Sequence, residues 1–332
     1  MKKILFIIFT CCVFSCCCFA QQPTRHMPVI FDSDMGADYD DVGAITMLHA
    51  FADSGYINIL ATVASTSYKD VAGVFDVLNT YFNRPNLPIG VAKKNGLALR
   101  DWQHWPDTLL ANYPHDIRSN EEVPEAVDVY RKALAAAQDQ SVTIITVGFL
   151  TNLANLLQSG PDQYSSLSGT ELVKQKVKRL VSMAGKFPVG KEFNVEKDAA
   201  SSQYVFLHWP TQVLLSGFEI GQKIKVGLPL TKNDNIRRSP VKDVFRICIP
   251  KAKEDSAGRM SWDETAVLVA VKGYQPYYNI ESGTMIVAAD GSNTWTTAGS
   301  MHAHLVEKVS PDNVAAYIEK LISHQPVKLS KQ

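Results

Sequence analysis

The chain has 332 residues, of which 46% are hydrophobic and 20% charged, an ordinary globular composition with enough apolar residues for a large core. Its 33 Lys and Arg residues balance 33 Asp and Glu residues, so the formal net charge is zero. This balance excludes the strong basic charge with which proteins bind nucleic acid or an acidic membrane surface, and we expect neither partner.

The first twenty residues differ in composition from the rest of the chain. Two lysines precede the apolar stretch 4–19, and the small residue Ala20 follows it. A basic start, a short apolar run and a small residue predict a signal peptide over 1–20, cleaved after Ala20, and an exported protein. A membrane anchor needs roughly 20 apolar residues, more than this stretch supplies. The alternative is a lipoprotein that keeps Cys16 as its lipidated N-terminus.

Five of the six cysteines lie in this leader, which leaves Cys248 alone in the mature chain. An intramolecular disulfide is then not available, so the core has to hold the exported protein together. We expect residues 21–332 to form one α/β domain and Cys248 to be a buried thiol.

Beyond the leader, short apolar runs typical of strands alternate with helical patterns. The expected strands cover 28–31, 57–65, 141–148, 178–185 and 211–221. The expected helices cover 40–52, 69–82, 124–138 and 198–208. Near-continuous apolar strands between helices predict an α/β fold with an open, mainly parallel sheet that has helices on both faces. Two later runs, 283–291 and 300–309, predict a β pair before a closing helix at 311–323.

The loop after the first strand reads DSDMGADYDD, from Asp32 to Asp41, and holds five aspartates. Ligands bind beyond the carboxyl ends of the strands in such sheets, and this loop lies at one of those ends. Capping of the helix at 40–52 explains at most two of the five carboxylates. The mutual repulsion of the others requires a cation, and oxygen ligands without nearby His or Cys suit Ca²⁺ or Mg²⁺.

Two other kinds of aspartate-rich site fit this loop less well. An EF-hand needs Glu at its twelfth position, and the twelfth residue counted from Asp32 is Gly43. A phosphatase of the haloacid dehalogenase type also places Asp-x-Asp after a strand, but it normally continues with Gly-Thr or Gly-Val, whereas Met35-Gly36 follows Asp34 here. A metal-dependent phosphohydrolase of the Asp-x-Asp kind stays open as an alternative.

The segment Asp32-Ser33-Asp34-Met35-Gly36, closed by Asp40-Asp41, resembles the aspartate signature of the inosine–uridine-preferring nucleoside hydrolases. Three further stretches match this family in its order: 147–152, Met183 followed by 192–194, and Trp262-Asp263. Four matches in order make the resemblance specific, from about Val29 to the closing helix. It implies a Rossmann-like fold, calcium-dependent hydrolysis of ribonucleosides to free base and ribose, and a homodimer or homotetramer.

The resemblance also implies a role for each matching residue. Asp34 would bind Ca²⁺ and take a proton from the attacking water, and the other ion ligands would be Asp41, Asp263 and the backbone carbonyl of Val147. Asp40 would bind the ribose 2-hydroxyl. Glu192 and Asn194 would hold ribose hydroxyls, with Phe193 packing between them. The chemistry agrees with these roles, because cleavage of the N-glycosidic bond passes through a sugar cation that carboxylates stabilise.

Trp262 lies where many members of the family carry a His that protonates the leaving base. Its Trp-Asp pair resembles that of the purine-specific branch, where indoles stack on the base, so we expect purine nucleosides to be favoured. A core Trp beside a metal ligand is the alternative. Trp102, His104 and Trp105 would supply another wall or an acid, or would be aromatic anchors of a polar loop.

The sugar-binding segments depart from the family in two places. Ser67 or Tyr68 would have to replace an Asn that often follows the second strand, and the loop 186–191 is short and lacks another Asn. A modified sugar or another ribosyl compound is therefore an alternative substrate. A calcium-dependent ribosyl-binding protein that lost turnover through Trp262 is a further alternative. Thr151 and Asn152 are expected chiefly to cap the helix that follows the strand at 141–148.

Overall fold

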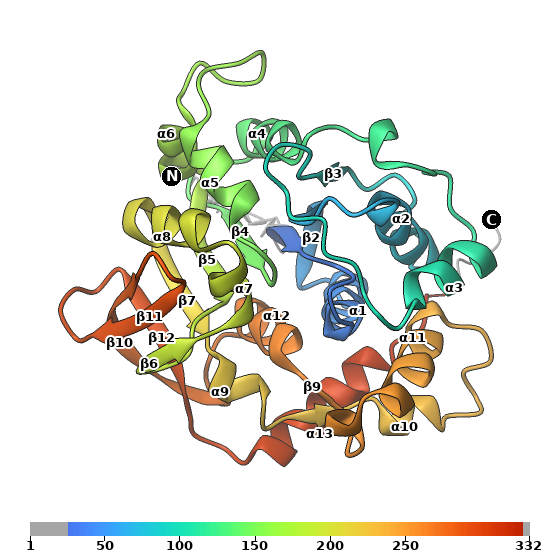
Figure 1. Ribbon diagram of the computed structural model, residues 1–332. Coiled ribbons are helices and arrows are strands. Elements are labelled where there is room, and N and C mark those ends of the chain that lie inside the picture. Colours follow the sequence, from blue (N-terminus) through green and yellow to red (C-terminus); the bar gives the residue numbers. More distant parts are fainter. Residues whose placement is uncertain (1–25, 328–332) are drawn as a thin grey trace, which may run out of the picture.

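The computed structural model in Figure 1 describes residues 26–327. The expected leader over 1–20, with its cleavage site and Cys16, lies outside the described residues. Within 26–327, every helix is too short or too polar to cross a membrane.

A ten-stranded sheet runs through the structure in the order β3-β2-β1-β4-β5-β7-β12-β10-β11-β6. Its strands are β1 (Met27–Ser33), β2 (Ile57–Ala64), β3 (Ile89–Val91), β4 (Val142–Thr146), β5 (Val177–Met183), β6 (Val189–Lys191), β7 (Gln212–Ser216), β10 (Tyr278–Val287), β11 (Ser292–Thr296) and β12 (His302–Glu307). The strands from β3 to β12 pair in parallel, and β10, β11 and β6 add an antiparallel edge. The expected open, mainly parallel sheet is thus confirmed. Two short strands, β8 (Lys225–Val226) and β9 (Arg259–Met260), pair separately.

Helices cover both faces of this sheet, as expected (Figure 1). One face packs against α1, α2, α11, α12 and α13, and the other against α4, α5, α6 and α8. The helices are α1 (Asp40–Asp53), α2 (Val71–Tyr81), α3 (Trp105–Asn112), α4 (Ala126–Ala136), α5 (Thr151–Gln158), α6 (Gly169–Lys176), α7 (Phe193–Lys197), α8 (Ala199–His208), α9 (Phe218–Gly221), α10 (Leu228–Thr231), α11 (Pro240–Cys248), α12 (Trp262–Lys272) and α13 (Pro311–Ile322).

The elements expected from the sequence form. One expected strand is longer than the observed one, and several observed helices were not expected. The strand expected at 211–221 ends at Ser216, because the chain turns at Gly217 and 218–221 form α9. Helix α12 has no expected counterpart. Its residues from Asp263 to Ala270 are all buried, so the apolar positions show no helical period that a sequence pattern would reveal. Cys248 is buried, as expected.

The strand order identifies the end of the sheet at which a ligand is expected to bind. From β1 the sheet extends through β2 and β3 on one side and through β4, β5 and β7 on the other. Ligands bind beyond the carboxyl ends of parallel strands at such a reversal of strand order. Asp34 follows β1 there, and Val147 follows β4.

Candidate functional site

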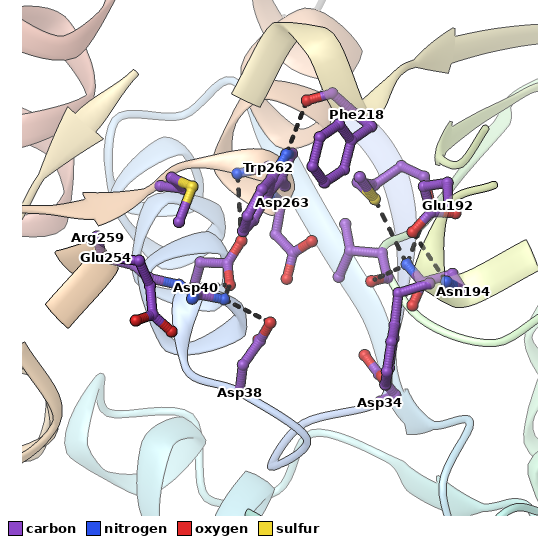
Figure 2. A pocket seen from close by; sticks show the side chains of 14 residues that line it. Asp34, Asp38, Asp40, Glu192, Asn194, Phe218, Glu254, Arg259, Trp262 and Asp263 are labelled. Atoms are coloured by element: carbon purple, nitrogen blue, oxygen red, sulfur yellow. Dashed lines mark hydrogen bonds and ion pairs between the residues drawn. The ribbon is translucent and has the colours of Figure 1, made fainter. Parts of the chain in front are cut away.

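A pocket of about 280 Å³ opens at this end of the sheet (Figure 2). Its walls come from the loops after several strands and from the start of α12. Asp34 follows β1, Val147 follows β4, Met183 ends β5, Phe218 follows β7, and Trp262 begins α12. All four stretches that matched in the sequence, between 32 and 263, therefore contribute residues to one cavity.

The loop after β1 is fixed at its start by Asp32, which is fully buried. The Tyr130 hydroxyl donates a hydrogen bond of 2.8 Å to the Asp32 carboxylate, and the Asn152 amide donates another at 3.1 Å. The end of β4 approaches the same loop so closely that a Cβ atom on Gly148 would lie 2.3 Å from the backbone nitrogen of Asp34. Asp32 is thus a structural anchor, and Asp34 is the aspartate of this pair that reaches the pocket.

Asp34, Asp41 and Asp263 are buried carboxylates that lie near one another. Burial, and then the charge of Asp41, raises the pKa of Asp34 well above its usual range. Burial, and then Asp40, raises the pKa of Asp41 to about 7. Burial and the aspartates of the loop, led by Asp40, likewise raise the pKa of Asp263. Such mutual repulsion in a buried site favours either protons or a cation among these oxygens.

The residues present fit a hard cation. One oxygen of Asp41 accepts a hydrogen bond from the Ser33 hydroxyl, and its other oxygen finds no donor within residues 26–327. An unpartnered buried carboxylate oxygen is costly unless an ion or water meets it. The donors are all oxygen, which is the ligand set of Ca²⁺ and Mg²⁺ rather than of zinc. Within the described chain, oxygens of Asp38, Asp40 and Asp263 also lie within 4.8 Å of one another, but Asp38 and Asp40 both pair with Arg259.

Asp40 and Asp38 share an arginine, Arg259, that the sequence did not single out. Asp40 accepts hydrogen bonds from Nε and Nη2 of Arg259 at 3.1 and 2.5 Å, and Asp38 forms an ion pair with the same guanidinium. Arg259 is 7% exposed and lies over the rings of Tyr39 and Trp262. Only the fold brings Arg259 to the aspartate loop, because 219 residues separate it from Asp40 in the chain.

The segment after β6 forms the opposite side of the pocket. Glu192 caps α7 by accepting hydrogen bonds from the backbone N–H groups of Asn194 and Val195, and burial raises the pKa of Glu192 to about 7. The Asn194 amide donates a hydrogen bond of 3.0 Å to the carbonyl of Val147, and Phe193 is 45% exposed. All three expected sugar-binding residues of this segment line the pocket together with Val147.

Two aromatic residues form one wall of the pocket, and one of them was not anticipated. The indole N–H of Trp262 donates a hydrogen bond of 2.8 Å to the carbonyl of Phe218, and the two rings stack with centroids 5.3 Å apart. Figure 2 shows Trp262 between Phe218 and the Arg259–Asp40 pair. Phe218 escaped notice because its segment read as the end of a strand rather than as the short helix α9.

The other aromatic candidates lie elsewhere. Trp105 is fully buried and donates its indole N–H to the backbone carbonyl of Asp38 at 3.0 Å, so it anchors the aspartate loop. Trp102 is 63% exposed and, like His104, does not line the pocket. Tyr68 lies under the loop, where its ring occupies the space that a side chain at Gly36 would need.

Thr151 and Asn152 differ from their expected role as caps. Leu150 is the cap residue of α5 and makes no side-chain bond there, whereas the Thr151 hydroxyl donates to Asp198. The Asn152 amide binds Asp32 and the carbonyl of Ala64. Asn152 therefore supports the aspartate loop from behind.

Comparison with known proteins agrees with this geometry. The family model described as inosine-uridine preferring nucleoside hydrolase matches residues 29–319. The pyrimidine-specific ribonucleoside hydrolase RihA of Escherichia coli O81 (strain ED1a) is 25% identical over 228 residues, which cover 66% of this chain and 68% of RihA. Two solved structures share the fold. A purine-preferring ribonucleoside hydrolase from Gardnerella vaginalis has a TM-score of 0.70 and 16% identity, over 89% of this chain and 98% of its own. An inosine-uridine preferring nucleoside hydrolase from Bacillus anthracis has a TM-score of 0.67 and 14% identity, over 90% and 99%.

Proposed function

The chain belongs to the inosine-uridine preferring nucleoside hydrolase family and is therefore a hydrolase of N-glycosyl bonds, and we propose that it uses calcium to release the base from ribonucleosides, with purine nucleosides favoured. The family match decides against the alternative of an Asp-x-Asp phosphohydrolase. The observation that supports the calcium proposal best is the buried, unpartnered oxygen of Asp41, whose charge acts on Asp34 and Asp263, two carboxylates that line the pocket.

We propose that the ion is held by Asp34, Asp41, Asp263 and the backbone carbonyl of Val147. Calcium bound there would lower the pKa of a water molecule and bind sugar hydroxyls. Asp34 would accept a proton from the attacking water, which matches its place on the pocket wall and the raised pKa that burial and then the charge of Asp41 give it. The other carboxylates stabilise the positive charge that develops on the sugar.

The sugar lies, in this proposal, between the aspartate loop and the segment after β6. Asp40 belongs to the aspartate loop, and Glu192, Phe193 and Asn194 face it from the opposite side of the pocket, where Glu192 and Asn194 are already oriented by hydrogen bonds to backbone groups. Preorientation of polar groups reduces the entropy lost when substrate binds. The base then lies against the wall of Trp262 and Phe218, where stacking assists its departure.

A panel of nucleosides tests the reaction and the base preference. Inosine, adenosine, uridine and cytidine are offered to the wild-type protein, and released base and reducing sugar are measured together. We expect both products in equal amounts, with inosine and adenosine turned over faster than uridine and cytidine. A faster reaction with uridine would contradict the purine preference. Binding of nucleosides without release of base would instead support the non-catalytic ribosyl-binding protein.

Replacing Trp262 by alanine should reduce the turnover of inosine more than that of uridine. Aromatic stacking contributes about 0.5–1.5 kcal/mol beyond buried area, so the extra loss for inosine should be roughly two- to tenfold. Trp102→Ala is the matched control, because Trp102 is exposed and lies outside the pocket. Equal losses of inosine and uridine turnover in Trp262→Ala would show that the indole packs in the core and does not stack on the base.

Export and assembly remain part of the proposal. The leader at 1–20 supports secretion or a periplasmic location with cleavage after Ala20, or attachment through Cys16. The family resemblance supports a homodimer or homotetramer with a small nucleoside as the ligand.

A further inference from the structure

Asp40 has its hydrogen-bonding capacity filled by protein groups. One carboxylate oxygen accepts from Nε and Nη2 of Arg259, and the other accepts from the backbone N–H groups of Trp262 at 3.1 Å and Asp263 at 3.3 Å. A carboxylate offers about four acceptor sites, and four donors occupy them here. Asp40 is also only 1% exposed. It therefore joins the start of α1 to the start of α12 and has no oxygen to spare for a ligand.

Asp38 differs from Asp40 in exposure although both contact Arg259. Its side chain is 47% exposed and lines the pocket, and its pairing with Arg259 runs through one oxygen. The second oxygen is available to a ligand. An oxygen of Asp38 also lies within 4.8 Å of oxygens of Asp40 and Asp263, so Asp38 reaches the centre of the acidic site (Figure 2).

Two anchors hold Asp38 in this position. The buried indole of Trp105 donates to its backbone carbonyl at 3.0 Å, and Arg259 holds its carboxylate. Arg259 is itself fixed, since its guanidinium lies 4.8 Å from the ring centre of Tyr39 and 5.2 Å from that of Trp262. A loop residue held from both its backbone and its side chain is preorganised for binding.

We infer that Asp38 accepts a hydrogen bond from a hydroxyl group of the sugar, and that Arg259 and Trp105 are the positioning residues that aim it. The guanidinium holds one oxygen of Asp38 in place, which leaves the other oxygen to accept a hydrogen bond from a hydroxyl donor. This inference rests on the proposed function, and it gives Asp38 the contact for which the motif alone suggested Asp40.

The test compares Asp38→Ala with Asp40→Asn on inosine, 2′-deoxyinosine and 3′-deoxyinosine. Wild-type protein should prefer inosine to at least one deoxy analogue, and Asp38→Ala should lose roughly ten- to a hundredfold of that preference, the range for a hydrogen bond to a charged group. Its unfolding temperature should stay near that of the wild type. Asp40→Asn should instead unfold about 5–10 °C earlier, because it breaks a buried ion pair, and should keep the preference.

Conservative variants separate positioning from folding. Arg259→Lys keeps the charge but loses the planar guanidinium that binds two carboxylates. Its preference for inosine over the deoxy analogues should therefore lie between those of wild type and Asp38→Ala. Asp38→Asn, which retains an acceptor oxygen, should recover part of the loss. Asp234→Asn changes an exposed aspartate outside the pocket and is the matched control.

The inference is wrong if Asp38→Ala keeps the wild-type preference, or if Asp40→Asn alone loses it. Failure of the proposed function looks different, because wild-type protein would then release no base from inosine. In that case calorimetry with the same three nucleosides decides the matter. Tighter binding of inosine than of a deoxy analogue, lost in Asp38→Ala, supports the inference, and equal binding of all three by the wild type overturns it.

Discussion

Replacing Asp34 by alanine is expected to lower turnover by roughly 10³-fold or more while the protein stays folded. A positioned general base contributes about 10²–10⁴-fold, and the proposed loss of an ion ligand adds to this effect. Measured without calcium, stability should not fall, because burial and the charge of Asp41 already make the ionised form of Asp34 unfavourable. Initial rates on inosine and thermal unfolding of the same preparation provide the two measurements.

Asp32→Ala is the matched control for this prediction. Asp32 lies two residues earlier and is also buried, but it receives hydrogen bonds from Tyr130 and Asn152 rather than facing the pocket. Its removal leaves these donors unpaired, so Asp32→Ala should lower the unfolding temperature. A variant Asp34→Ala with normal turnover would show that the proton acceptor lies elsewhere.

The parallel sheet was predictable because its signal is local. Central strands such as β1 and β4 are buried along most or all of their length, so their runs consist mainly of apolar residues. The same burial hid α12, in which apolar residues surround the helix and leave no polar face. Burial thus revealed the strands and concealed the helix that carries Trp262 and Asp263.

From composition and spacing alone, the candidate site was predictable only where it is contiguous in the chain, and the family resemblance supplied its distant stretches. The aspartates follow one another within a single loop, so their shared need for a cation can be read from composition and spacing. Arg259 contacts that loop from 219 residues away, and an isolated arginine between Gly258 and Met260 has no pattern that marks it.

The spacing of the aspartates also does not show which of these chemically identical residues has which role. Asp38 and Asp40 differ in what surrounds them, since one side chain is half exposed and the other is enclosed by four donors. Such a difference arises from the packing of α1 against α12 and from Trp105, and neither contact has a counterpart in the local sequence.

Removal of divalent ions is expected to abolish most turnover and to destabilise the protein more at pH 8 than at pH 5. Burial raises the pKa of Asp41 to about 7, and the pKa values of Asp34 and Asp263 lie well above their usual range. Because these values are raised above the unfolded value of about 3.9, the native state binds more protons than the unfolded state. The free energy of unfolding of the ion-free protein therefore falls as the pH rises from about 4 through 7.

Calcium should reverse this trend, since it binds the ionised carboxylates and replaces their protons. At a calcium concentration of about 100 times Kd the gain is about 2.7 kcal/mol, enough to raise the unfolding temperature by several degrees. The measured quantity is the difference in unfolding temperature with calcium and with a chelator, at both pH values. Burial also raises the pKa of Asp32 to about 7, but Asp32 is outside the proposed ligand set, so its contribution cancels in this difference.

Asp34→Ala and Asp290→Asn separate the ion site from general charge effects. Asp34→Ala removes a proposed ligand and should shrink the calcium-dependent difference, whereas Asp290 pairs with Lys191 at the surface and its substitution should leave the difference unchanged. Turnover should fall more than a hundredfold in chelator and return when calcium is added. A stabilisation by calcium that is the same at pH 5 and pH 8 would mean that the ion does not meet these carboxylates. Unchanged turnover in protein shown by metal analysis to be free of divalent ions would assign the activation of water to Asp34 alone.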